Sequence, residues 1–489
     1  MAFLDLPGET PRSYPEQFNL RSKLHSLKVF SKLNQSKVMS ELSLEIVNPH
    51  SAGIDVGSRF HMVAVGQGAQ DVKKFGVFTQ DHQILIEWLK IQGIRRVAME
   101  STGSYWQTLF DSLQQAGFEV ILVNGSHVKN VKGKKTDVLD CMWIQKLHSL
   151  GLLNASFLPQ AELQKLRTYY NHRQHLVHQT ARYINKMQKA LRLMNIRLEI
   201  VINDIMGTSG RAIIEAIIKG ERDPVNLSLL ANYRVRKPKA EIAKSLEGNW
   251  REDLLFELQE CLDLYDLYCS KIKKCDQVLE TKINDLAIQQ SPVGSDHKEV
   301  KVKQVSKFSP SFNIREMATR YFGVDLCEIG GVSNNTVLCL LTNLGNDIHR
   351  FPTAKHFCSW LRLSPNNKVS GGKVLSSRTP KGKNRIALAI RQAANSVGNQ
   401  KNHPMGAFFK RIAFKKGREA AVTATARKLS VIFFNMITRK QRYQPYINDD
   451  KEQVVKTKLI KKLKQKLWKM NLGKEELKRM FETLTLSAT

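Results

Sequence analysis

The sequence predicts a mixed α/β domain on the N-terminal side, a helical coiled-coil middle and a mainly α-helical C-terminal region. Three observations support this fold class. Short apolar strands alternate with helical segments between residues 49 and 155, apolar residues recur every seven positions between 163 and 198, and helical spacing returns from residue 321 onward. At 489 residues the chain is long enough for several domains with their own buried cores.

Residues 1–48 contain scattered prolines and serines without clear periodicity, so we expect a loosely ordered extension there. The α/β domain is expected over residues 49–155. Its strands are predicted in AGIDVGSRFHMVAVG (two strands), DVKKFGVF, RRVAMES and FEVILVN, and its helices in HQILIEWLKIQG, SYWQTLFDSLQQAG and TDVLDCMWIQKLHSLG. Three strands followed by alternating helices and strands are the order of a ribonuclease-H-like (RuvC-like) fold.

Residues 156–290 are predicted as a coiled-coil helical region. A heptad repeat connects Leu163, Tyr170, Val177, Ile184, Leu191 and Leu198. The second apolar position of the same heptad holds Leu166, Met187 and Met194. At two of its repeats this position is occupied instead by Arg173 and Thr180. A second apolar stripe runs through Leu254, Leu258, Cys261, Tyr265, Tyr268, Ile272, Cys275 and Leu279. Two arrangements fit these stripes equally: a helical hairpin within one chain, and a coiled coil that joins two chains.

The C-terminal half is expected to begin with a polar linker at 291–320, followed by a helical domain at 321–440. Within that domain, CEIGGVSNNTVLCLLTNLG is predicted as a helix-hairpin-helix whose backbone N–H groups can bind a phosphate. Residues 441–489 are predicted as a basic helix that binds phosphates electrostatically, with an apolar face formed by Leu459, Leu463, Leu467 and Met470.

The composition points to a polyanionic partner. Lysine and arginine number 76 against 44 aspartates and glutamates, which gives a formal net charge of +32. This excess favours binding to nucleic acid. The seven cysteines form no C-x-x-C pair, which is typical of core thiols in a reducing compartment. We expect neither a signal peptide nor a membrane span, and therefore a cytoplasmic protein.

Four carboxylates are candidates for a metal site. Asp55 lies in the first predicted strand and Glu100 ends the fourth, so they become neighbours if these strands pair. Asp137 and Asp140 are three positions apart at the start of a helix and share a face. Four carboxylates without histidine or cysteine select Mg²⁺ or Mn²⁺. Each acid by itself is also compatible with a helix cap or a surface charge. The preceding lysines are candidates for binding the DNA backbone: Lys129, Lys132, Lys134 and Lys135.

A second cluster, LRLSPNNKVSGGKVLSSRTPKGKNR, holds a candidate nucleophile. Ser370 precedes two glycines, which leave its hydroxyl accessible. The surrounding cations are candidates for phosphate binding: Lys373, Arg378, Lys381, Lys383 and Arg385. A serine hydroxyl needs a base or a metal to become a good nucleophile. From the spacing alone, a flexible phosphate-binding loop without chemistry is the favoured alternative.

The chain resembles the DEDD insertion-sequence transposases, a family related to the Piv DNA invertase and known as bridge-RNA-guided recombinases. The resemblance covers GIDVGSRFHMVAVG through MESTGSYWQTLFDSL, VILVNGSHVKNVKGKKTDVLDCMWIQKL, and the segments from IGGVSNNTVLCLLTNLGN to KGKNRIALAIRQAA, about half of the chain. It implies a ribonuclease-H-like domain with Asp55, Glu100, Asp137 and Asp140 as its carboxylates. It also implies a transposase domain in which Ser370 matches the serine that forms a covalent 5′-phosphoserine link to DNA.

The same resemblance implies several partners: donor and target DNA, a non-coding bridge RNA that selects the site by base pairing, and further copies of the chain in a dimer or tetramer. The implied location is the nucleoid in the cytoplasm of a prokaryote. Three other functions fit the residues. These are a metal-dependent Holliday-junction nuclease that uses water, a site-specific invertase without RNA guidance, and a non-catalytic nucleic-acid scaffold.

Overall fold

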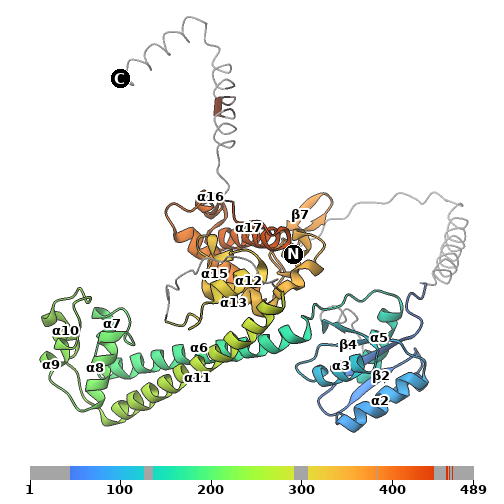
Figure 1. Ribbon diagram of the computed structural model, residues 1–489, viewed down its shortest axis with the longest axis horizontal. Helices are drawn as coiled ribbons and strands as arrows, with labels where there is room; N and C mark the ends of the chain where they lie inside the picture. Colours follow the sequence, from blue (N-terminus) through green and yellow to red (C-terminus); the bar gives the residue numbers. More distant parts are fainter. Residues whose placement is uncertain are drawn as a thin grey trace, which may run out of the picture. The chain divides into compact units, whose positions relative to one another are not determined.

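The computed structural model describes residues 45–125, 136–290, 307–382 and 384–444, together with residues 457, 459, 460, 462 and 465. Most of the expected extension at 1–48 and of the expected basic helix at 441–489 therefore lies outside the described residues. The chain divides into two compact units, Met1–Leu158 and Pro159–Thr489 (Figure 1).

The first unit is built on a five-stranded mixed sheet with the order β3-β2-β1-β4-β5. Strand β1 pairs antiparallel with β2 and parallel with β4, and β5 pairs parallel with β4. This mixed sheet confirms the predicted α/β domain, which is consistent with a ribonuclease-H-like fold. The strands are β1 (Ser51–Val56), β2 (His61–Ala64), β3 (Val72–Phe75), β4 (Arg96–Glu100) and β5 (Glu119–Val123). The helices are η1 (Ala69–Asp71), α2 (Thr79–Ile91), α3 (Trp106–Gln115) and α5 (Asp137–Ser149).

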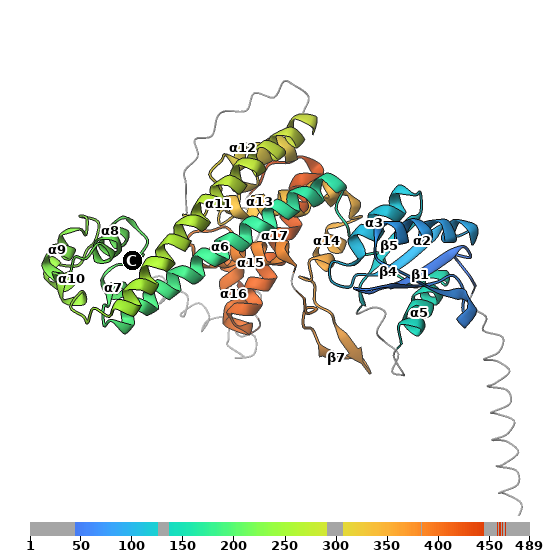
Figure 2. The same cartoon turned by 90° about the horizontal axis from the view of Figure 1, so that it is seen from below.

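Helices cover both faces of this sheet. Because side chains alternate along a strand, Val97 and Met99 of β4 pack into the larger core cluster, whereas Ala98 packs with Ile144 of α5. Helices α2 and α3 lie on one face and α5 on the other (Figure 2). Helix α5 approaches β1 closely at Gly53, where a Cβ would overlap the backbone of Cys141 and Gln145. The missing side chain at Gly53 therefore makes room for α5.

The second unit begins with two long helices that pack along each other, α6 (Ala161–Leu193) and α11 (Glu252–Gln290) (Figure 1). The two predicted apolar stripes therefore meet within one chain. Arg173 and Thr180 are not breaks in the stripe but buried parts of it. The guanidinium of Arg173 forms a buried ion pair with Asp276 of α11, and its Nη2 also donates to the Phe308 carbonyl (3.2 Å).

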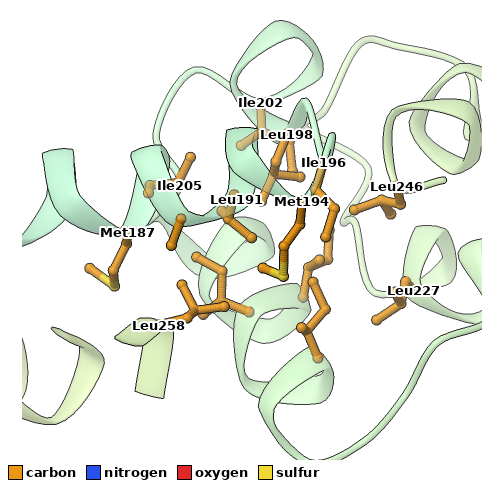
Figure 3. Packing of buried hydrophobic residues seen from close by; sticks show 14 of the residues in the cluster. Met187, Leu191, Met194, Ile196, Leu198, Ile202, Ile205, Leu227, Leu246 and Leu258 are labelled. Carbon is orange, nitrogen blue, oxygen red and sulfur yellow. The ribbon is translucent and has the colours of Figure 1, made fainter. Parts of the chain in front are cut away.

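The heptad was predicted to run to Leu198, but α6 ends at Leu193. Asn195 takes a left-handed conformation (φ 59°), which turns the chain into a small helical cluster at the end of the two long helices. The cluster has its own apolar core, which includes Leu191, Met194, Leu227 and Leu246 (Figure 3). Its helices are α7 (Leu198–Val201), α8 (Thr208–Ile218), α9 (Pro224–Leu229) and α10 (Lys239–Ser245).

The remainder of the second unit is mainly helical, as predicted. Its first helix begins at Ile314, inside the range expected to be a linker, because Asn313 caps it and Ile314, Met317 and Tyr321 are buried. The helices are α12 (Ile314–Phe322), η2 (Leu326–Glu328), α13 (Asn334–Asn343), η3 (Gly345–Arg350), α14 (Ala354–Trp360), α15 (Arg385–Asn399), α16 (Gly406–Lys416) and α17 (Arg418–Arg439). A two-stranded hairpin consists of β6 (Lys368–Ser370) and β7 (Lys373–Ser376).

Among the described residues, one helix is long and apolar enough to cross a membrane by length and composition. This is α17. Its side chains Ala426, Leu429 and Phe433 are fully buried, and the helix packs against α14, α15 and α16. Burial in a protein core accounts for its apolar composition.

Candidate active site

The sheet places Asp55 and Glu100 side by side. Ile54 pairs with Met99 in the parallel register of β1 and β4, so one further step along the strands brings Asp55 level with Glu100. The two strands therefore pair as the sequence argument required. Gly125, just after β5, leaves room for the Glu100 carboxylate, since a Cβ at that position would collide with Glu100 Oε1.

Helix α5 contributes the second pair of acids. Thr136 caps the helix by accepting a hydrogen bond from the Leu139 backbone N–H (3.3 Å). Asp137 and Asp140 lie in its first turn, three positions apart and thus on one face. Asp137 is exposed, whereas Asp140 is half-buried.

All four carboxylates line one cavity of about 490 Å³. The strand ends supply Asp55 and Glu100, and α5 supplies the other two. The remaining lining residues come from the β1–β2 turn, from β2 and from the segment after β4: Val56, Gly57, Ser58, Arg59, Phe60, Met62, Ser101 and Thr102. Sequence reasoning missed Arg59, Ser58 and Thr102. The one available signal was their position immediately after the two candidate acids.

The donor set of this cavity suits a hard cation. Apart from Arg59, its polar side chains offer only carboxylate and hydroxyl oxygens, which are the ligands of Mg²⁺ and Mn²⁺. The nearby thiol of Cys141 does not line the cavity; burial, and then the negative charge of Asp55, raise its pKa to about 12. As the side chains stand, no three acidic, histidine or cysteine side chains within the described ranges are grouped closely enough to hold one ion. The acids share a cavity but are not in a closed coordination shell.

Ser370 lies in the second unit, on the β6–β7 hairpin. It is the last residue of β6 and is exposed. The turn is Gly371-Gly372, and both glycines have positive φ (53° and 73°), as a tight two-residue hairpin requires. Ser370 pairs with Lys373 across the hairpin, so the two side chains point to the same face. The segment is therefore a hairpin rather than a flexible loop.

The candidate phosphate-binding cations near Ser370 are exposed where the structure describes them: Lys373, Arg378, Lys381 and Arg385. The Arg378 carbonyl accepts a hydrogen bond from Asn366 N (3.0 Å), and Arg362 donates to the Lys381 carbonyl, so backbone contacts hold the segment in place. Lys383 and the lysines Lys129, Lys132, Lys134 and Lys135 lie outside the described residues.

The glycine-rich segment before α13 is packed closely. A Cβ at Gly330 would crowd the His403 ring, and one at Gly331 (φ 88°) would crowd Val397 and the Ala393 carbonyl. His403 Nδ1 accepts from Met405 N (3.0 Å), so its Nε2–H donates to the Gly330 carbonyl (2.9 Å). These contacts give both glycines a packing role. Phosphate binding by a helix-hairpin-helix stays a prediction here.

Comparison with known families gives two matches. A transposase family model for DEDD enzymes matches residues 52–196, which include the four carboxylates. A second model, described as the transposase IS116/IS110/IS902 family, matches residues 325–410, which include the β6–β7 hairpin. No curated protein matches the chain.

The fold and these two matches define the chain as a transposase, an enzyme class that cuts and rejoins DNA. It belongs to the IS110 family of DEDD transposases.

Proposed function

We propose that this transposase cuts and rejoins DNA through the hydroxyl of Ser370, with a divalent cation, Mg²⁺ or Mn²⁺, held by the carboxylates of the first unit. The observation that carries the proposal is the single cavity lined by Asp55, Glu100, Asp137 and Asp140. Acids that are 85 positions apart along the sequence (Asp55 and Asp140) converge there, as a shared ligand would require.

The four carboxylates would hold the cation, with Ser58 and Thr102 beside them. When bound, such an ion supplies positive charge that stabilises phosphoryl transfer. DNA binding would have to draw the acids together, because they form no closed coordination shell as they stand. Arg59, at the same cavity, is suited to hold a phosphate of the DNA backbone.

Ser370 Oγ would attack the scissile phosphorus. A new phosphorus–Oγ bond forms, the bond to the 3′ oxygen breaks, and DNA stays attached as a 5′-phosphoserine. The serine proton passes to a base, and the departing 3′ oxygen takes up a proton. Attack by a 3′-hydroxyl from another strand reverses these bonds and rejoins DNA. Lys373 faces Ser370 across the hairpin, where its ammonium can hold the negatively charged phosphate.

Ser370 and the carboxylates belong to different units of the chain, so the complete site requires the two units to assemble on DNA. We propose that they do so in a dimer or tetramer, in which the intrachain α6–α11 pair contributes its outer surface to the contact between subunits. A bridge RNA would select the site by base pairing, and cytoplasmic complexes would act at the nucleoid. The net charge of +32 supports such a role, since RNA and DNA backbones are held mainly by cations.

The test compares Ser370→Ala with Ser377→Ala, a matched control on the same exposed segment. Ser370→Ala should lose DNA cleavage by about three orders of magnitude or more and retain DNA binding, because a covalent nucleophile is removed without loss of charge. Ser377→Ala should cleave normally. A protein–DNA adduct that survives denaturation should form with the wild type and with Ser377→Ala, but not with Ser370→Ala.

The competing function is a nuclease that uses water at the carboxylates. It is favoured by the location of all four acids in the first unit, without any contribution from the hairpin. In that case Ser370→Ala cleaves at the wild-type rate and no adduct appears, while Asp55→Asn is inactive. This result would contradict the serine mechanism.

A further inference from the structure

The helical cluster at the end of α6 and α11 carries an aromatic ring that the transposase site does not use. Tyr233 lies in the loop between α9 and α10, outside both family matches, and its side chain is 89% exposed. Exposed apolar residues lie on the preceding helix and at its end: Val225, Leu229 and Leu230. Helix α9 is anchored from its other face by Leu227, which points into the core (Figure 3).

This loop is held in one shape by hydrogen bonds on both sides of the tyrosine. The Asn232 N–H donates to Ser209 Oγ (3.0 Å), and the Arg234 N–H donates to Asn232 Oδ1 (3.0 Å). Further along, Val235 packs against the core, and Lys239 Nζ donates to the Ser228 carbonyl (2.8 Å). A fixed loop therefore presents the ring to solvent, and little conformational entropy is lost if a ligand binds it.

The charge around the ring is positive. Residues 224–240 contain four lysines and arginines and no acid. Lys237 is paired with Glu241 (2.6 Å), and Lys239 donates to backbone carbonyls. The other two cations of this segment are Arg234 and Arg236. No carboxylate in the described part of the chain forms an ion pair with either arginine. Arg234 Nε donates to the Tyr233 hydroxyl (3.4 Å), and its guanidinium lies 5.7 Å from the centroid of the Tyr233 ring.

We propose that this loop is a binding site for single-stranded nucleic acid, in which an unpaired base stacks on Tyr233 while Arg234 and Arg236 hold the adjacent phosphates. An aromatic platform next to cations that no carboxylate neutralises is the combination that single-strand binding uses. A duplex offers phosphates but no free base face, so it engages the arginines without the ring. The proposal does not depend on the assignment of Ser370.

Photo-cross-linking tests the contact directly, even when other parts of the chain also bind nucleic acid. The full chain is irradiated with a single-stranded RNA or DNA of roughly 20 nucleotides carrying 5-iodouracil, a base analogue that reacts with stacked aromatic rings. Mass spectrometry should locate the cross-link at Tyr233. A cross-link with RNA alone, with DNA alone or with both supports the site and identifies its ligand.

Affinity provides the second readout. Tyr233→Ala should weaken single-strand binding about tenfold, and Tyr233→Phe should restore it, because stacking needs the ring and not the hydroxyl. Arg236→Gln should reduce the salt dependence of binding by about one ion. Phe256→Ala is the matched control: Phe256 is 68% exposed on α11, but its charged neighbours at 252, 253, 257 and 260 are acids, so no change is expected.

Several results would overturn the site. One is the absence of a Tyr233 cross-link with both probes, and another is an equal loss of duplex and single-strand affinity in Tyr233→Ala. A third is a sedimentation experiment in which Tyr233→Ala changes only self-association, which would make the loop a protein contact. Ser370→Ala should give the wild-type cross-link, so failure of the serine mechanism and failure of this site are separate outcomes.

Discussion

At the scale of single residues, the buried histidines of the first unit couple its stability to pH. His61 is 1% exposed, its ring lies 5.5 Å from that of His82, and neither ring nitrogen of His61 has a hydrogen-bond partner among the described residues. Burial, and then the charge of His82, lower the pKa of His61 to about 4, against the opposing influence of Asp81. The native state therefore favours the neutral ring.

The sign of the pH effect follows from this lowered pKa. The unfolded chain takes up a proton near pH 6.5 and the folded chain only near pH 4, so stability is complete above about 6.5 and falls as the pH drops toward 4. Between pH 7 and pH 5 His61 should contribute a loss of about 2 kcal/mol, and His148, whose pKa burial likewise lowers to about 4, should add a loss of the same order. Pulse proteolysis in urea, which follows the first unit separately, measures it.

His61→Phe is the corresponding control. The substitution removes one titrating group and breaks no hydrogen bond, so the variant should lose about 2 kcal/mol less than the wild type between pH 7 and pH 5, while the contribution of His148 remains. An equal loss in the variant and the wild type would assign the acid sensitivity to other groups.

At the scale of elements, the Arg173–Asp276 pair fixes the register of α6 against α11. Both side chains are at most 2% exposed, and Asp276 also accepts from the Ser311 N–H (3.1 Å), which ties the segment before α12 to the two helices. Arg173→Met should cost about 3–5 kcal/mol, because it leaves a buried carboxylate unpaired. Urea unfolding of the second unit measures this cost.

The double variant Arg173→Met, Asp276→Leu distinguishes a lost ion pair from lost packing. Removing both charges should recover most of the stability, because no charge remains buried without a partner. If the double variant is as unstable as the sum of the two single variants, the pair is not coupled and the register must be set by the apolar contacts alone.

The same pair shows what the sequence could and could not predict. Heptad spacing identified both stripes, because apolar periodicity is a local property of the chain. It could not reveal that Arg173 is an interior residue, since its partner lies 103 positions away. Likewise, the sequence indicated that Asp55 and Glu100 become neighbours if their strands pair, whereas Arg59 was missed because its place at the cavity depends on the path of the β1–β2 turn.

At the scale of the whole molecule, the division of the chain at Leu158–Pro159 separates the two halves of the proposed chemistry. The acids lie before the division and the serine lies after it. No spacing rule in the sequence relates the two units, because each folds around its own core. Under the proposed function, a serine from one subunit would meet the carboxylates of another. Two chains that are each inactive could then complement each other, which a site formed within one subunit does not allow.

Mixing two inactive variants tests this arrangement. Ser370→Ala retains the acids and Asp55→Asn retains the serine, so a site shared between subunits is whole wherever the two chains meet in the correct order. For random pairing in a symmetric dimer, about a quarter of the sites should be intact, and cleavage should return to about that fraction of the wild-type rate. Each variant alone should stay inactive. A mixture as inactive as its components, although the chains exchange, would mean that each subunit supplies both serine and acids to its own site.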